Sequence, residues 1–223
     1  AGNENPKYKI LEKYTNGINI MFFANNNVLK PMQERNDSRI SRYFEPGADG
    51  VYRGLDTRQA AEETDDENAD LLSSVISKYL FRKEAPELIY SYQEQLFFEA
   101  EAYVRGLGVT SNLVKANELY KKAIQTTEFI DALDDLNTLE PDRALYEIHI
   151  QQWIDLMDRP LEEFVQWRRS GSNGNEVPVL TVPTEATSRE LIRRWEYSPE
   201  EMTANPNAPK ESPKIWEKMW FDL

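Results

Sequence analysis

The sequence predicts an all-α protein built from antiparallel helix pairs of the tetratricopeptide kind. Two apolar stripes indicate one such pair, because small and apolar residues recur at steps of three and four over Tyr92–Leu107 and again over Leu113–Thr127. Three alanines lie in these stripes, where two helix backbones can approach closely. Gly106 and Gly108 mark the point where the first helix ends and the chain reverses. Such pairs are the units of helical-repeat proteins, which are binding scaffolds more often than enzymes.

Before this pair, the sequence predicts short helices and long loops. Residues 1–20 contain turn-forming residues and few helix signals. A helix is expected over Asn25–Glu34, and the Asn and Asp side chains within Asn36–Ile40 can cap a further short helix. Glycines punctuate the loop that follows, and the acidic stretch Glu62–Asp70 is expected to stay on the surface.

Two more helices are predicted after the pair. The first runs over approximately Pro141–Asp158, with a proline suited to a first helical turn at its start. Arg159-Pro160 interrupts the pattern, and the second helix carries Leu161–Trp167 to a stop at Ser170-Gly171. By the same proline rule, Ala85–Glu87 is expected to begin the first helix of the pair.

The segment Ser172–Leu223 is predicted to be irregular, with at most a short helix over Ser188–Trp195, because it contains many prolines. It also carries five aromatic residues, which are Trp195, Tyr197, Trp216, Trp220 and Phe221. Disordered segments are depleted in aromatic residues, so we expect this segment to pack back onto the helices. We interpret residues 1–223 as a single region of one domain.

Composition excludes several classes of function. The formal net charge is −13 and the isoelectric point is near 4.7. Nucleic-acid binding is excluded, because it needs clustered basic residues to replace counterions and the sequence has no basic run. The absence of cysteine excludes disulfides, thiolate metal sites, a cysteine nucleophile and a lipid-attachment cysteine within this chain. No apolar stretch approaches the ~20 residues that cross a bilayer. Ala1–Tyr8 lacks the apolar region of a secretion signal, so a signal for export is expected upstream, if one exists.

The titratable residues give little support to catalysis or metal binding. His149 is the only histidine, so a multi-histidine metal site cannot be built within this chain. Its place on an apolar helix face predicts a hydrogen-bonded core residue and not the base of a Ser-His-Asp triad. Glu99 and Glu101 point to different faces of their helix, and Glu101 is placed to pair with Arg105. The acidic residues of Asp131–Asn137 lack the glycine turn and terminal glutamate of a calcium loop, so we expect them to cap helices.

The remaining large side chains have structural interpretations. Four aromatic residues on predicted apolar helix faces are expected in the core, and these are Tyr103, Tyr120, Trp153 and Trp167. The arginine pairs at positions 168–169 and 193–194 are expected to cap carbonyl groups or to pair with acids. No metal ion or cofactor is predicted.

Five parts of the chain, taken in order, carry a family resemblance. They are Asn36–Ile40 with Tyr43–Pro46, Gly50–Gly54, Ala85–Ile89 with Glu99–Ala102, Glu147–Leu156 with Glu163–Ser170, and Ile192–Pro199 with Asn205–Asn207. In this order they resemble the carboxy-terminal half of SusD/RagB-type proteins, the glycan-binding lipoproteins of Bacteroidetes outer membranes. The sequence departs from the family pattern at Trp195, where a smaller residue is usual, and it lacks the amino-terminal half with its lipidation cysteine. That half supplies part of the family's ligand site, so a site assigned to this chain is expected to be incomplete.

The resemblance implies a non-catalytic protein that binds oligosaccharides at the bacterial cell surface and passes them to a SusC-like TonB-dependent transporter. It implies attachment to the outer membrane through an upstream lipid anchor, and no cofactor. Two alternatives stay open: a Sel1-like scaffold that binds protein, and a glycoside hydrolase, which needs only two carboxylates at a set separation. Further helix pairs upstream would favour the scaffold. A lipidation cysteine upstream would favour the SusD-like protein, and turnover of a labelled oligosaccharide would favour the hydrolase.

Three tyrosines are candidates for the glycan-binding site under the leading interpretation. Tyr14, Tyr43 and Tyr52 lie beside loop signals, and an exposed aromatic face can stack on the axial C–H groups of a sugar ring. Glycines on both sides of Tyr52 permit tight turns that hold its side chain outward. We therefore expect Tyr52→Ala to weaken glycan binding by about 1 to 3 kcal/mol, with almost no change in melting temperature.

Overall fold

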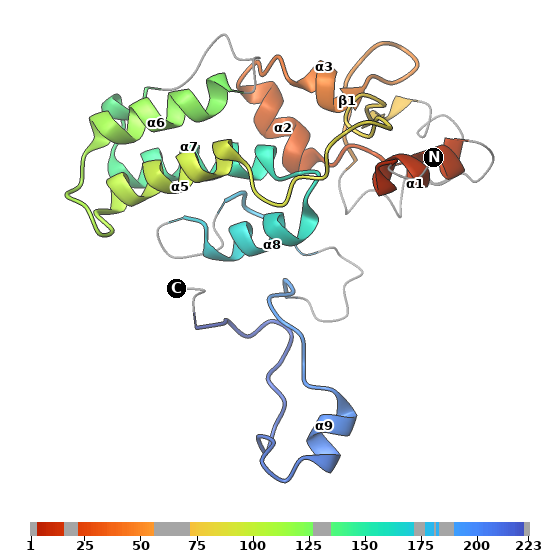
Figure 1. The fold of residues 1–223 in the computed structure, drawn as a ribbon, viewed down its shortest axis with the longest axis vertical. Helices are drawn as coiled ribbons and strands as arrows, with labels where there is room; N and C mark the ends of the chain where they lie inside the picture. Colours follow the sequence, from red (N-terminus) through yellow and green to blue (C-terminus); the bar gives the residue numbers. More distant parts are fainter. Residues whose placement is uncertain are drawn as a thin grey trace.

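Helices form most of the regular structure of the protein (Figure 1). The computed structural model describes residues 4–15, 22–55, 72–126, 135–171, 177–180, 182 and 190–220. The α-helices in these ranges are α1 Pro6–Thr15, α2 Asn26–Glu34, α3 Ile40–Tyr43, α5 Tyr92–Arg105, α6 Leu113–Gln125, α7 Pro141–Asp155, α8 Pro160–Arg169 and α9 Pro199–Ala204. The same ranges contain the 3-10 helix η2 Leu136–Thr138 and the strands β1 Phe44–Glu45 and β2 Val75–Ile76. The all-α prediction is confirmed.

The helix pair α5–α6 forms as the sequence predicts. Ser91 and Glu94 make a reciprocal capping box at the start of α5, and Gly106 follows the helix in the left-handed conformation, with φ of 70°. Asn112 caps the start of α6 through its side chain. The three alanines of the predicted stripes are completely buried in one hydrophobic cluster with Tyr120, which we call the first cluster.

Two helix starts differ from the sequence predictions. Residues Ala85–Glu87 are not helical, because α5 begins only after its cap at Ser91. Helix α1 forms within residues 1–20, where the sequence has turn-forming residues and few helix signals. The side chain of Asn5 explains why, because it accepts a hydrogen bond from the backbone N–H of Lys7 at 2.8 Å. A residue that favours turns also favours the start of a helix, since both uses rely on the same local hydrogen bond.

Helix α7 lies at the centre of the molecule and connects two hydrophobic clusters. Its first half places Leu145 and Ile148 in the first cluster, against α5, α6 and η2. Its second half places Ile150, Trp153 and Ile154 in a second cluster, together with residues of α2 and α8. A helix that is buried on all sides in this way belongs to the core and positions the elements around it.

Three of the four aromatic residues predicted to lie in the core are confirmed there. Tyr120, Trp153 and Trp167 are buried. Tyr103 is half-buried and packs against the first cluster from its edge.

Strands β1 and β2 form a two-residue antiparallel ladder that the sequence did not predict. Phe44 pairs with Ile76 and Glu45 pairs with Val75. Because β1 directly follows α3, the ladder brings the residues after β2 against that helix. The backbone N–H of Ser77 continues the contact by donating to the carbonyl of Tyr43 at 2.9 Å.

Residues 190–220, which we call the arm, extend away from the helical body (Figure 1). Its two limbs are joined where the backbone N–H groups of Arg193 and Arg194 donate to the carbonyl of Ile215. The first limb meets the body through Leu191, which packs on the second cluster, and through the carbonyl of Arg193, which accepts a hydrogen bond from the Arg168 side chain.

The prediction that the whole aromatic tail packs onto the helices is therefore correct only at the start of the arm. None of residues 190–220 is buried, and Trp195 and Trp220 are 84% and 87% exposed. The short helix proposed over Ser188–Trp195 does not form in the described residues 190–195, and α9 forms further along instead. The aromatic content of this segment predicted packing onto the helices, but the rings lie outside the core.

Replacing Gly106 tests the reversal between α5 and α6. We expect Gly106→Ala to lower the free energy of unfolding by about 1 to 2 kcal/mol, because an L side chain resists positive φ. A Cβ at this position would meet no atom closer than 3.6 Å, so the loss reports on backbone conformation and not on a clash. Gly106→Asn should recover part of it, because Asn tolerates the left-handed region. Urea denaturation measures both, and equal losses in the two variants would contradict this explanation.

Candidate functional site

A cleft of about 300 Å³ opens where α3, the chain after β2, the start of α5 and the end of α7 meet. This volume lies at the small end of the range for ligand pockets. Two tyrosines line it, Tyr43 and Tyr79. Its polar lining is formed by Arg39, Arg42, Arg82, Gln93, Thr126, Asp155 and Asp158. The cleft therefore joins aromatic rings with groups that donate and accept hydrogen bonds.

Arg39 forms the floor of the cleft and is held by the core. Its side chain is only 1% exposed, and its Nη2 donates to Asp37 and to Gln151, both at 2.6 Å. A buried charge is tolerable only when it is paired and hydrogen-bonded in this manner. Its Nη1 is also buried and has no hydrogen-bond partner among the described residues.

Tyr43 stands beside this floor at the end of α3. Its ring is half-buried against the second cluster, with the Arg39 guanidinium 6.0 Å from the ring centroid. Burial raises the pKa of the Tyr43 hydroxyl to about 12. The hydroxyl is therefore neutral at physiological pH, with both a proton to donate and lone pairs to accept a hydrogen bond.

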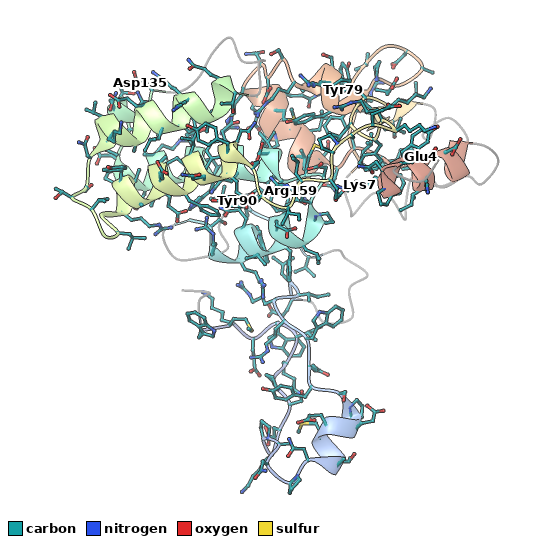
Figure 2. The ribbon with its side chains drawn as sticks, in the orientation of Figure 1. Glu4, Lys7, Tyr79, Tyr90, Asp135 and Arg159 are labelled. Carbon is teal, nitrogen blue, oxygen red and sulfur yellow. The ribbon has the colours of Figure 1, made fainter. Side chains whose placement is uncertain are left out.

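Tyr79 holds two arginines at the mouth of the cleft. The guanidinium carbons of Arg42 and Arg82 lie 4.3 and 4.4 Å from the centroid of its ring. Arg42 also donates to the Tyr79 hydroxyl, and Arg82 donates to the Tyr79 carbonyl at 2.9 Å. The ring is 42% exposed and lies beside α3 (Figure 2). Tyr79 thus fixes the positions of two long cationic side chains by cation–π contact.

The two aspartates of the cleft are paired with cations from outside it. Asp155 accepts from Arg159 at 3.3 Å, and burial raises its pKa to about 6, an effect that Arg159 and Arg39 oppose. Asp158 lies 3.7 Å from the ammonium group of Lys7 in α1. Both carboxylates therefore serve the packing of the end of α7.

The three tyrosines predicted from the sequence do not converge on this cleft. Tyr43 lines it. Tyr52 packs its half-buried ring against the second cluster, so the expectation that its ring points outward is wrong. The backbone carbonyl of Tyr52 accepts a hydrogen bond from Gln33 at 3.0 Å. The backbone of Tyr14 lies in α1, and its side chain lies outside the described part of the structure.

Sequence reasoning missed Tyr79, Arg42 and Arg82. The rule that selected Tyr43, a tyrosine beside turn signals, could have found Tyr79, because Pro86 follows it at a short distance. No local pattern marks the two arginines. The β1–β2 ladder brings Tyr79 to Arg42, and Arg82 follows Tyr79 by three residues on the same segment.

Charged groups outside the cleft have the structural roles that the sequence predicts. His149 is completely buried, accepts a hydrogen bond at Nδ1 from the backbone of Gly171, and has its Nε2 3.3 Å from Glu101. Glu101 also pairs with Arg105 and Arg169, at 2.8 and 2.7 Å. Burial lowers the pKa of His149, so the ring is neutral.

The acidic stretch after α6 shows no metal site in the part that can be described. Asp135 caps η2 by accepting from the backbone N–H of Asn137 and also pairs with Lys121. Asp131 and Asp134 lie outside the described residues. Within the described ranges, no three side chains of the metal-binding types cluster together.

A second cleft, of about 320 Å³, is mainly apolar and less suited to a polar ligand. Its lining includes Phe23, Trp153 and Glu163. The indole N–H of Trp153 is already used, because it donates to the carbonyl of Asn27 at 3.1 Å. Oε1 of Glu163 is buried with no partner among the described residues, and burial raises the pKa of this carboxyl from its ordinary value of 4.5 to about 8.

Glu163 should make stability depend on pH. Between the ordinary pKa of 4.5 and about 8, the folded state keeps a proton that the unfolded state has lost, so the free energy of unfolding falls as pH rises. We expect Glu163→Gln to remove a slope of up to about 1.4 kcal/mol per pH unit from this range. Urea denaturation across the range measures the slope. Exposed Glu162→Gln is the matched control, and an unchanged slope in Glu163→Gln would refute the assignment.

Comparison with known proteins places the chain in a family. A search of curated proteins found no match. Within the described residues, no helix has the length and apolar content to cross a membrane. A SusD-like family model, described as starch-binding and associating with the outer membrane, matches residues 1–198. Family membership implies glycan binding without catalysis, in association with the outer membrane. The match covers most of the chain and agrees with the motif order and helical fold, and the chain belongs to this SusD-like family.

Proposed function

We propose that the cleft lined by Tyr43 and Tyr79 is the glycan-binding site of this protein. The observation that carries the proposal is that aromatic rings and fixed hydrogen-bonding side chains meet in one cleft. A sugar offers apolar C–H groups and many hydroxyls, so its recognition requires both kinds of surface. In this cleft Tyr43, Leu80 and Pro86 supply apolar surface, and Gln93, Arg42 and Arg82 supply donors.

The cleft is built so that little order must be gained on binding. Arg39 is fixed by Asp37 and Gln151, and the two outer arginines are fixed against Tyr79. Immobilising a long side chain on binding costs about 0.5 to 1.5 kcal/mol. Side chains that are already held avoid most of this cost, which supports a role in binding.

We further propose that the protein captures oligosaccharides at the cell surface and passes them to a TonB-dependent transporter. The family's association with the outer membrane supports this proposal. The hydrolase alternative loses support, because family members are non-catalytic. Purification of the full-length protein from detergent-extracted outer membranes tests the partner, and recovery without any transporter would argue against it.

Replacing Tyr79 tests the cleft. We expect Tyr79→Ala to weaken glycan binding by about tenfold, because it releases both outer arginines from their cation–π contacts. Electrophoresis through native gels that contain soluble polysaccharides measures the affinity from the retardation of the band. The gels contain starch, dextran, dextran sulfate, polygalacturonate and methyl-esterified polygalacturonate.

Tyr197→Ala is the matched control for this experiment. Tyr197 is also 42% exposed, but it lies on the arm and does not line the cleft. It should leave retardation unchanged. Equal losses in the two variants would move the binding surface away from the cleft, and the absence of retardation in every gel would refute glycan binding by this region.

A further inference from the structure

We propose that Tyr90 is a sugar-stacking platform beside the cleft, so that the ligand is an oligosaccharide long enough to contact both. This inference rests on the proposed function of the cleft and concerns the length of its ligand. The chain before α5 connects the two places, because Leu88 lines the cleft and Tyr90 follows it by two residues. Two residues of extended chain span at most about 7 Å. A row of sugar rings that leaves the cleft past Leu88 would therefore reach Tyr90.

The ring of Tyr90 is held in place by further side chains. It stacks on the ring of Phe98 in α5, with the centroids 6.4 Å apart and the planes inclined by 11°. The guanidinium carbon of Arg169 in α8 lies 4.7 Å from the centroid of the Phe98 ring, and Arg169 pairs with buried Glu101 at 2.7 Å. The platform is thus connected to the core, and a ligand would not have to immobilise it.

One face of the Tyr90 ring stays available for a ligand. The contact with Phe98 occupies one face, and Tyr90 is nevertheless 55% exposed. Its hydroxyl makes no hydrogen bond with another described residue. An open aromatic face can stack on the C–H groups of a sugar ring, and the phenol can donate to and accept from sugar hydroxyls.

The tyrosines that line the cleft offer less open surface for stacking. Two guanidinium groups lie over the ring of Tyr79 and compete for its faces. Tyr43 is half-buried against the second cluster. The cleft therefore supplies fixed hydrogen-bonding groups in a partly apolar wall, and Tyr90 adds an open aromatic face. The two places complement each other in the recognition of one glycan chain.

The surroundings of Tyr90 fit a sugar better than a protein or a lipid surface. A stable protein interface buries about 800 Å² on each partner, whereas one aromatic side chain buries only about 150 to 250 Å². Exposed Gln95 donates to exposed Glu99 at 2.8 Å on the same helix. Partial burial and the carboxylates of Glu94 and Glu99 raise the pKa of the Tyr90 hydroxyl, so these carboxylates lie near the ring. An exposed carboxylate at this edge can accept hydrogen bonds from sugar hydroxyls, and it disfavours insertion into a membrane.

The test compares short and long oligosaccharides of the same chemistry. Isothermal titration calorimetry measures the binding of maltotriose and maltoheptaose, of isomaltotriose and isomaltoheptaose, and of trigalacturonate and heptagalacturonate. We expect the longer member of at least one pair to bind about tenfold more tightly than the shorter member, which is the scale of one stacked ring. The reason is that only the longer member can occupy the cleft and contact Tyr90 together.

Substitutions at three positions identify the ring as the cause. Tyr90→Ala should remove the advantage of the longer oligosaccharide, a loss of about tenfold. Tyr90→Phe should keep most of this advantage, because the aromatic face remains. Ile89→Ala is the matched control, because Ile89 is 90% exposed beside Tyr90 but has no ring, and it should keep the advantage. Tyr79→Ala, which changes the cleft itself, should weaken the binding of both members of a pair.

The outcomes separate this inference from the proposed function. Equal affinities for the two members of every pair, with both weakened in Tyr79→Ala, would overturn the inference and keep the function. The inference would also be overturned if Tyr90→Ala weakened the shorter and longer members equally, or if Ile89→Ala cost as much as Tyr90→Ala, as expected for an apolar protein or lipid contact. A loss in Tyr90→Phe equal to that in Tyr90→Ala would overturn stacking in favour of a hydroxyl contact. Binding of none of the six oligosaccharides would overturn the inference, and retardation in the polysaccharide gels would then decide whether the function stands.

Discussion

The structure depends on satisfying four polar side chains that α7 carries into the core. These are Glu147, His149, Gln151 and Gln152, none of which is more than 1% exposed. Each requires a partner, because an unsatisfied buried polar group costs about 1 to 3 kcal/mol. Arg35 after α2 pairs with Glu147 at 2.8 Å, and the Gly171 backbone after α8 donates to His149. Arg39 before α3 donates to Gln151, and Gln166 of α8 donates to Gln152. The polar contacts of one helix therefore determine where the surrounding elements lie.

The cleft follows from the contact between Arg39 and Gln151. Arg39 can bind Gln151 only if the chain before α3 crosses α7 near its carboxyl end, and this crossing places Tyr43 beside Asp155. The β1–β2 ladder then carries Tyr79 to the outer side of α3. One wall of the site is thus continuous with the core, and the other is attached by a ladder of two residues per strand. Such a site has a rigid floor and a mouth that is fixed by surface contacts.

The helices were predictable from the sequence because their signals are local. Gly106 and the alanines of the stripes act within a few residues, and the structure uses them as expected. The cleft was not predictable, since Arg42 and Tyr79 are far apart in sequence and meet through a ladder with no recognisable pattern. Tyr52 shows the limit of a local rule: glycines permit an outward ring, but the nearby second cluster offers apolar surface, and the ring packs there. The aromatic residues of the arm show the reverse case, because they were expected to pack on the helices and are exposed instead.

The contrast between the arm and the body has a spectroscopic consequence. Trp153 and Trp167 are 9% and 2% exposed, whereas the arm's three tryptophans are between 40% and 87% exposed. Indole emission shifts to longer wavelength in water, so fluorescence from this protein is a sum of a short-wavelength component from the core and a long-wavelength component from the arm. A dissolved quencher such as acrylamide reaches the arm first. When the emission of the arm is quenched, the remaining signal comes from Trp153 and Trp167 in the body. Loosening of the body can then be followed separately from rearrangement of the arm in one sample.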